Sequence, residues 1–164
     1  MTHDFNMRRI LPGLTMAGAA TLLVLSSTTA TAAECPKNQM GVDVQKSGPM
    51  AVKNATDKVL GFIDLGQEKV GLKGHKFRFR RLDIKPGGEI AWHSHEDRPA
   101  LIYVLQGEIT EYSSTCKVPL VHKAGDLSIE DHPVKHWWKN TGKKTVVLLA
   151  ADIMNTGMTD EMTQ

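Results

Sequence analysis

The spacing of apolar runs after residue 58 constrains the fold more than any other feature of this sequence. Short apolar or alternating runs, each of four to eight residues, follow one another closely, with Gly, Pro, Asn and Asp between them. No segment shows a sustained helical period, and such spacing is typical of an all-β sandwich or barrel with antiparallel connections. We therefore predict strands at 59–65, 77–84, 89–94, 100–105, 108–113, 118–121, 126–129, 136–139 and 145–152.

Residues that favour turns fall between these runs. Glycine supplies positive φ angles, proline fixes φ, and Asn and Asp tolerate the conformations of tight turns. The predicted turns lie at 86–88, 107, 124–126, 132–133 and 140–142.

Length and charge exclude several classes of partner. The 164 residues suffice for one domain with an apolar core. The formal net charge is only +2, and acidic residues are mixed with the basic ones, whereas a nucleic-acid surface needs a concentrated basic patch. We therefore expect a small-molecule ligand or substrate, and no nucleic acid.

The first 33 residues have the pattern of a secretory signal peptide. Arg8 and Arg9 precede an apolar run over 10–25, and small residues follow up to Ala33. A basic, an apolar and a small-residue segment in this order is typical of export signals. We expect cleavage near Ala32 or Ala33, which makes the mature protein periplasmic or secreted.

A membrane anchor is the alternative interpretation of the same segment. A spanning helix needs roughly 20 apolar residues, and this run is shorter and interrupted by Pro12, Gly13, Thr15 and Gly18. We therefore predict no stable membrane anchor. Translation starts at Met1 or at Met7, since the two arginines follow Met7 directly.

The chain is thus predicted to have four parts: a cleaved signal peptide at 1–33, an N-terminal extension at 34–55, a β-barrel at 56–154 and a C-terminal tail at 155–164. Both cysteines, Cys35 and Cys116, stay in the mature protein. Exported compartments permit disulfides, so one bridge that ties the new N-terminus to the barrel is the expected pairing. Two unpaired thiols are the alternative, because sequence does not give the distance between them.

Three histidines form the candidate site. His93 and His95 are two residues apart at the end of the strand predicted at 89–94, and in extended backbone both imidazoles project from the same face and can bind one metal ion. His136 opens another predicted strand and would complete a three-nitrogen site if the two strands are neighbours. We expect His75 and His122 to be structural.

The histidines lie within two spaced motifs that resemble those of the cupin superfamily. The first motif is matched by Gly87, His93, His95 and Gly107, and the second by Gly125, His136 and Asn140. Asp131 and Pro133 stand where the second motif usually has proline and glycine. The resemblance covers roughly residues 60–152 and implies a cupin-like double-stranded β-helix, which is a jelly-roll barrel.

One departure from the first motif bears on the metal. Ala100 stands where cupins usually carry a glutamate ligand, so the resemblance implies the three-histidine subset of cupins. His93, His95 and His136 would then hold a divalent transition metal that keeps open coordination positions. Fe(II) is the favoured metal, with Mn, Ni, Cu or Zn as alternatives.

Polar side chains next to the histidine pair have candidate roles. Glu96, Asp97 or His132 could supply a fourth ligand, although Glu96 should point away from the face of the histidine pair. The guanidinium of Arg98 could bind a substrate carboxylate. Its alternative is a surface ion pair with Glu96 or Asp97. We expect Trp138 to line the cavity.

Fold and metal do not name a reaction, so two functions follow. The first is a small-molecule oxygenase or another metal-dependent enzyme, in which no catalytic residue beyond the candidate Arg98 is identified. The second is a non-catalytic periplasmic module that captures a metal or a small ligand. A homodimer is left open.

Overall fold

The computed structural model describes residues 33–157. The predicted signal peptide, apart from Ala33, and residues 158–164 of the predicted tail lie outside this range. The described chain has one 3-10 turn, η1 (Lys37–Gln39), and otherwise strands. These are β1 (Lys53–Asp64), β2 (His75–Ser94), β3 (Ala100–Gln106), β4 (Glu108–Ser113), β5 (Leu120–Lys123), β6 (Leu127–Glu130), β7 (Lys135–Lys139) and β8 (Val146–Asn155).

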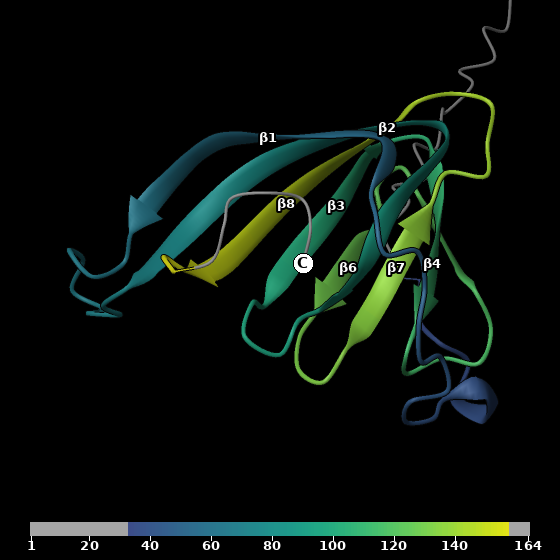
Figure 1. Ribbon diagram of the computed structural model, residues 1–164, viewed down its shortest axis with the longest axis horizontal. Helices are drawn as coiled ribbons and strands as arrows, with labels where there is room; N and C mark the ends of the chain where they lie inside the picture. Colours follow the sequence, from purple (N-terminus) through teal and green to yellow (C-terminus); the bar gives the residue numbers. More distant parts are fainter. Residues whose placement is uncertain (1–32, 158–164) are drawn as a thin grey trace, which may run out of the picture.

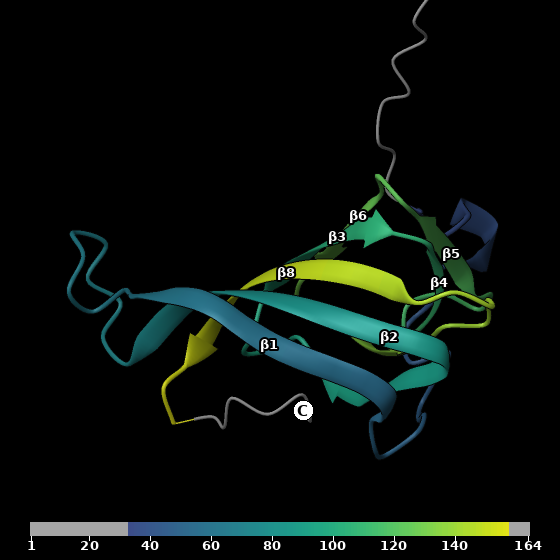
Figure 2. The ribbon, with the colours of Figure 1, turned by 90° about the horizontal axis from the view of Figure 1, so that it is seen from above.

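The eight strands form one antiparallel sheet that curls into a nearly closed barrel (Figures 1 and 2). The order is β5-β4-β7-β2-β8-β3-β6, and β1 pairs with β2 outside this path. The all-β jelly-roll prediction is confirmed. Within residues 33–157, no helix has the length and apolar character needed to cross a membrane.

Strand β2 connects the two halves of the barrel. Its first half, up to Ile84, pairs with β8 and β1, and its last residues, from Glu89 onward, pair with β7. The predicted turn at 86–88 was wrong, because the strand bends there without ending. Gly87 has a φ of +69°, which favours glycine, and its N–H donates to the Asn140 carbonyl at 3.0 Å.

The inward face of β2 changes in character along the strand. Arg78 and Arg80 are buried at its start, and Leu82 and Ile84 are buried after them, because alternate residues of a strand face the same side. Apolar side chains from both halves of the barrel pack around the latter pair. The core consists of Leu82, Ile84, Ile90, Ala100, Ile102, Val104, Ile109, Trp138, Val146, Leu148 and Ala150.

The N-terminal extension is attached to the barrel near the end of β4. The predicted disulfide between Cys35 and Cys116 is present and links positions 81 residues apart. Met40 forms an isolated bridge with Cys116, and the Gly41 N–H donates to the Thr115 carbonyl at 3.1 Å. A disulfide such as Cys35–Cys116 typically contributes about 2–4 kcal/mol to stability.

Candidate metal centre

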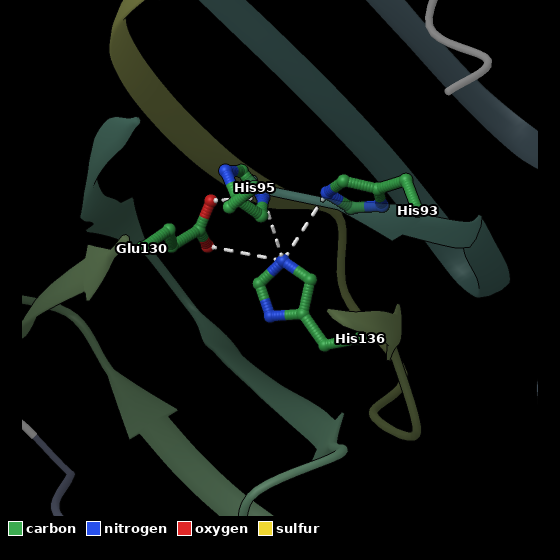
Figure 3. A group of neighbouring side chains, drawn as sticks. All are labelled: His93, His95, Glu130 and His136. Carbon is green, nitrogen blue, oxygen red and sulfur yellow. Dashed lines mark hydrogen bonds and ion pairs between the residues drawn. The ribbon is translucent and has the colours of Figure 1, made fainter. Parts of the chain in front are cut away.

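The fold brings the three predicted histidines together inside the barrel. His93 lies on β2, His95 directly follows this strand, and His136 lies on β7, where it is the Cα partner of His93. The Nε2 atom of His136 lies 3.1 Å from that of His93 and 3.0 Å from that of His95 (Figure 3). The pairing of β2 with β7, which the sequence did not reveal, creates this arrangement.

The hydrogen bonds at the other ring nitrogens indicate where each imidazole carries its proton. The Nδ1 atoms of His93 and His95 each lie 2.8 Å from a backbone carbonyl, that of Ala91 and of Arg98 respectively. A carbonyl only accepts, so both Nδ1 atoms donate. His136 Nδ1 lies 2.6 Å from Glu111 Oε1. In its neutral form, each ring therefore presents the lone pair of Nε2 to its neighbours.

The lone pair of His136 Nε2 lies about 3 Å from the Nε2 atoms of His93 and His95, and these lone pairs repel one another unless a cation lies between them. Neutral imidazoles with Nδ1 bonded to carbonyls or carboxylates are the usual form of histidine ligands to a metal. Trp138, whose indole N–H can only donate, lies 3.4 Å from the His136 Nε2 atom, in keeping with an acceptor at that nitrogen. The donor set therefore fits a divalent metal.

A carboxylate that the sequence analysis did not identify completes the group. Glu130, the last residue of β6, is 2% exposed. Its Oε2 atom lies 3.0 Å from His95 Nε2 and its Oε1 atom lies 3.6 Å from His136 Nε2. Oε1 has no hydrogen-bond partner within the described residues. The four potential ligand atoms lie within 4.8 Å of one another, so the group could hold a metal ion.

The position of Glu130 relates directly to the missing motif glutamate. Glu130 and Ala100 are Cα partners in the ladder between β6 and β3. The carboxylate thus comes from the strand next to the one on which cupins usually carry it. The sequence does not reveal that a glutamate at 130 takes the place of one at 100, because this depends on the register of β3 and β6, which are separated along the chain.

The alternative fourth ligands lie elsewhere. Glu96, Asp97 and His132 are exposed and are not members of the group.

Neighbouring charges set the protonation of the site. Burial, with the charges of His136 and His95, holds the pKa of His93 well below its usual value. Burial alone would lower the pKa of His136, but the charge of Glu130 and the hydrogen bond to Glu111 raise it. Burial would raise the pKa of Glu111, yet hydrogen bonds from His122 and His136 lower it to about 2. An ionised carboxylate therefore lies behind His136 and favours a cation at the site.

A cavity adjoins the imidazoles. His93, His95 and Glu130 line it together with the guanidinium-bearing residues Arg80 and Arg98, and Trp138 lines it as predicted. Apolar side chains of the core, among them Leu82, form the remaining wall. Asp57, the partner of Arg80, lines the cavity as well. The cavity thus has the candidate metal-binding group and two guanidinium groups on its lining, and a cation held by that group would suit a small anion.

Arg98 is buried within the barrel. It is 7% exposed, and its Nη1 atom lies 3.8 Å from Asp152 Oδ2. The alternative of a surface ion pair with Glu96 or Asp97 is therefore not the arrangement in the structure. The carbonyl of Arg98 accepts the Nδ1–H of His95, so the same residue orients His95 and lines the cavity.

A second buried cluster lies at the start of β2. The Arg78 guanidinium donates to Asp152 through Nε, at 3.0 Å from Oδ1, and through Nη2, at 2.9 Å from Oδ2. Arg80 pairs with Asp57 and, at 3.0 Å, with the same Oδ2 of Asp152. These four residues are called the arginine–aspartate cluster below.

Comparisons with known proteins agree with this architecture. Residues 80–152 match the cupin domain family. An oxalate-binding protein from Thermotoga maritima is 33% identical over 76 residues, which are 46% of this chain and 61% of that protein. Germin-like protein 8-14 from Oryza sativa subsp. japonica is 31% identical over 86 residues, which are 49% of this chain and 40% of that protein. The matched part is thus less than two thirds of either relative.

Solved structures support the same fold. An uncharacterised protein with a double-stranded β-helix domain from Klebsiella pneumoniae subsp. pneumoniae superimposes with a TM-score of 0.50 at 18% identity. The match covers 64% of this chain and 81% of that one. This likeness concerns the fold alone.

Proposed function

Because the chain belongs to the cupin superfamily, we propose that it is an exported metal-binding protein that binds a small carboxylate anion beside the metal. His93, His95 and His136 are the metal ligands in this proposal, and Glu130 is the fourth. The convergence of three Nε2 lone pairs on one point carries the proposal, because no hydrogen bond among neutral rings relieves their repulsion. When bound, a divalent transition metal supplies a Lewis acid to the cavity.

The donor set guides the choice of metal. Imidazole suits Fe, Cu, Ni and Zn, and carboxylate suits Mn. A mixed set of three imidazoles and one carboxylate supports Fe(II) first, with Mn(II) as the next choice and Ni, Cu or Zn after it.

The cationic lining supports an anionic ligand. Arg98 lines the cavity beside His93, His95 and Glu130, and a guanidinium binds carboxylates with two parallel hydrogen bonds. Arg80 lines it too, but it is already paired with Asp57 and Asp152. The named ligand of the relative from Thermotoga maritima is oxalate. We therefore propose a short carboxylate such as oxalate as the ligand, and Arg98 as the residue that contacts it.

A metal-dependent oxygenase is the second candidate function. Four protein ligands are fewer than the six that octahedral metals accept, so the donor count leaves room for further ligands. Oxygen consumption by the Fe(II)-loaded protein in the presence of oxalate would distinguish this enzyme from a binding protein.

Export and a homodimer complete the proposal. The pattern of residues 1–33 supports a periplasmic or secreted location.

The proposed dimer would form through an apolar face of the barrel. The outer face of β2, β8, β3 and β6 carries exposed apolar side chains, namely Phe77, Phe79, Leu101, Tyr103 and Ile129. Phe79, Ala151, Leu101 and Ile129 lie at one register across these four strands. Light scattering of wild type and of Leu101→Lys would test whether this face joins two copies.

Calorimetric titration of oxalate into metal-loaded protein tests the main proposal, after elemental analysis has established one metal per chain. We expect oxalate to bind the loaded protein and to bind Arg98→Gln at least tenfold more weakly, with the metal content unchanged. Arg81→Gln is the control. It removes the same charge as Arg98→Gln, but Arg81 does not line the cavity and pairs with Asp83 at the surface. Equal oxalate binding with and without metal would contradict the proposal.

A further inference from the structure

A second pair of buried ionisable residues lies behind His136, at the ring atom that faces away from the other imidazoles. Glu111 on β4 accepts the Nδ1–H of His136 through Oε1 at 2.6 Å. Its other oxygen, Oε2, lies 2.8 Å from the Nε2 atom of His122 on β5. Glu111 is 5% exposed, His122 is 1% exposed and His136 is fully buried.

The sheet register sets this chain of three side chains. Glu111 is the Cα partner of Trp138, two residues beyond His136, and β4 also pairs with β5. The carboxylate therefore lies between β7 and β5 and reaches a histidine on each side. Two hydrogen bonds hold it, which leaves its orientation little freedom.

We propose that Glu111 and His122 are positioning residues that prepare His136 to bind the metal. This inference rests on the proposed metal site. Glu111 keeps the proton of His136 on Nδ1, directs the Nε2 lone pair at the metal position and increases the basicity of the ring. His122 holds the Glu111 carboxylate in the orientation that this hydrogen bond requires.

The hydrogen bonds of His122 argue against a purely packing role. An ionised carboxylate accepts only, so His122 donates from Nε2. Its Nδ1 atom is buried and has no hydrogen-bond partner within the described residues. An apolar side chain would fill the same place beside Trp138, whose ring centroid lies 4.7 Å away, without burying an unpaired nitrogen. The contribution of His122 is therefore its bond to Glu111.

Four variants separate positioning from packing. Glu111→Gln keeps the shape of the side chain and an acceptor for His136 but removes the charge. His122→Leu removes the donor, and His122→Gln restores one at a similar reach. Glu108→Gln is the control, since Glu108 is on the same strand and its side chain is 55% exposed.

The affinity for Co(II) is measured by competition with a chromophoric chelator, and its absorption spectrum reports the ligand geometry. We expect Glu111→Gln to bind Co(II) about 10- to 100-fold more weakly, which is the usual effect of losing such a partner. His122→Leu should lose about threefold to tenfold, whereas His122→Gln and Glu108→Gln should match wild type. Equal affinity in wild type, Glu111→Gln and His122→Leu would overturn the inference.

A measurement on the metal-free protein keeps this inference distinct from the metal site itself. Long-range ¹H–¹⁵N spectra report which ring nitrogen of His136 carries the proton. We expect Nδ1–H in wild type and a mixture of tautomers in Glu111→Leu. A wild type that shows this tautomer but binds no Co(II) would contradict the proposed function, whereas an unchanged tautomer in Glu111→Leu would contradict the positioning role. Because these readouts do not depend on Glu111→Gln, the test holds even if that variant fails to fold.

Discussion

The barrel holds two buried polar clusters that differ in how their charges are balanced. In the arginine–aspartate cluster, Arg78 and Arg80 each lie within hydrogen-bonding distance of an aspartate carboxylate, so each buried guanidinium has an opposite charge beside it. Arg98 lies 3.8 Å from Asp152 at the edge of this cluster. In the candidate metal centre, three imidazole Nε2 atoms and the carboxylate of Glu130 face one another. All four of these groups are acceptors when the histidines are neutral.

This difference separates a structural role from a functional one. Buried ions are tolerated where opposite charges and hydrogen bonds compensate for lost hydration, as in the arginine–aspartate cluster. A group of acceptors without donors is compensated only by a cation or by an added proton. The first cluster should therefore affect folding with or without metal, whereas the second should affect mainly what the protein binds.

The largest expected effect is that of Asp152→Asn on folding. Asp152 contacts both Arg78 and Arg80, so its loss leaves buried positive charges poorly compensated, and breaking such a pair costs about 3–5 kcal/mol. Urea unfolding of the metal-free protein measures this change. Asp83→Asn, which removes an exposed partner of Arg81, should alter stability only slightly. Equal stability of the two variants would remove the contrast between the clusters.

Metal should stabilise the fold only through binding at the candidate metal centre. A ligand at 100 times its Kd stabilises the native state by about 2.7 kcal/mol. We expect thermal unfolding of wild type and of His75→Ala to shift upward with Mn(II) or Zn(II), and His136→Ala to show no shift. A shift retained in His136→Ala would place the metal at another site.

Glu130→Gln should weaken metal binding by about 10- to 100-fold and stabilise the metal-free protein. The amide can donate to an imidazole Nε2, which relieves the excess of acceptors that the carboxylate leaves. Chelator competition and urea unfolding measure the two effects. Glu96→Gln, at an exposed position that the sequence analysis named among three possible fourth ligands, should change neither. A loss of metal affinity in Glu96→Gln, with none in Glu130→Gln, would mean that Glu96 and not Glu130 is the fourth ligand.

The smallest expected effect tests the relocation of the carboxylate. Because Ala100 and Glu130 are Cα partners, a glutamate at 100 reaches the same region from the neighbouring strand. We expect the double variant Ala100→Glu, Glu130→Ala to bind metal about tenfold more tightly than Glu130→Ala alone. The same affinity in both would mean that the two positions are not interchangeable.

The sequence sufficed for much of the fold because turn residues and alternation are local signals. Strands near 100–105 and 108–113 and the disulfide between Cys35 and Cys116 are present as predicted. The bend at 86–88 was misread because glycine and proline signal a change of direction without telling a turn from a bend within a strand. The hydrogen bond from Gly87 to Asn140 decides between them, and it joins segments that are far apart in sequence.

The candidate site could be predicted only in part, because some of its contacts join segments that are far apart in the sequence. His93, His95 and His136 stood out by their motif spacing, whereas Glu130, Glu111 and His122 depend on which strands pair and in which register. Glu130 also lies one residue beyond the strand predicted at 126–129. It alternates with Ser128, and only the structure shows that both side chains are buried.

The central claim is that His93, His95, His136 and Glu130 bind one divalent transition metal, and a crystal structure of the metal-loaded protein tests it most directly. Anomalous diffraction at the absorption edge of the added metal should give a single strong peak among the three Nε2 atoms, with metal–nitrogen distances of about 2.0–2.2 Å and a Glu130 oxygen as the fourth protein ligand. A crystal of protein treated with stoichiometric metal that shows no peak among these imidazoles, or a peak at other residues, would contradict the account.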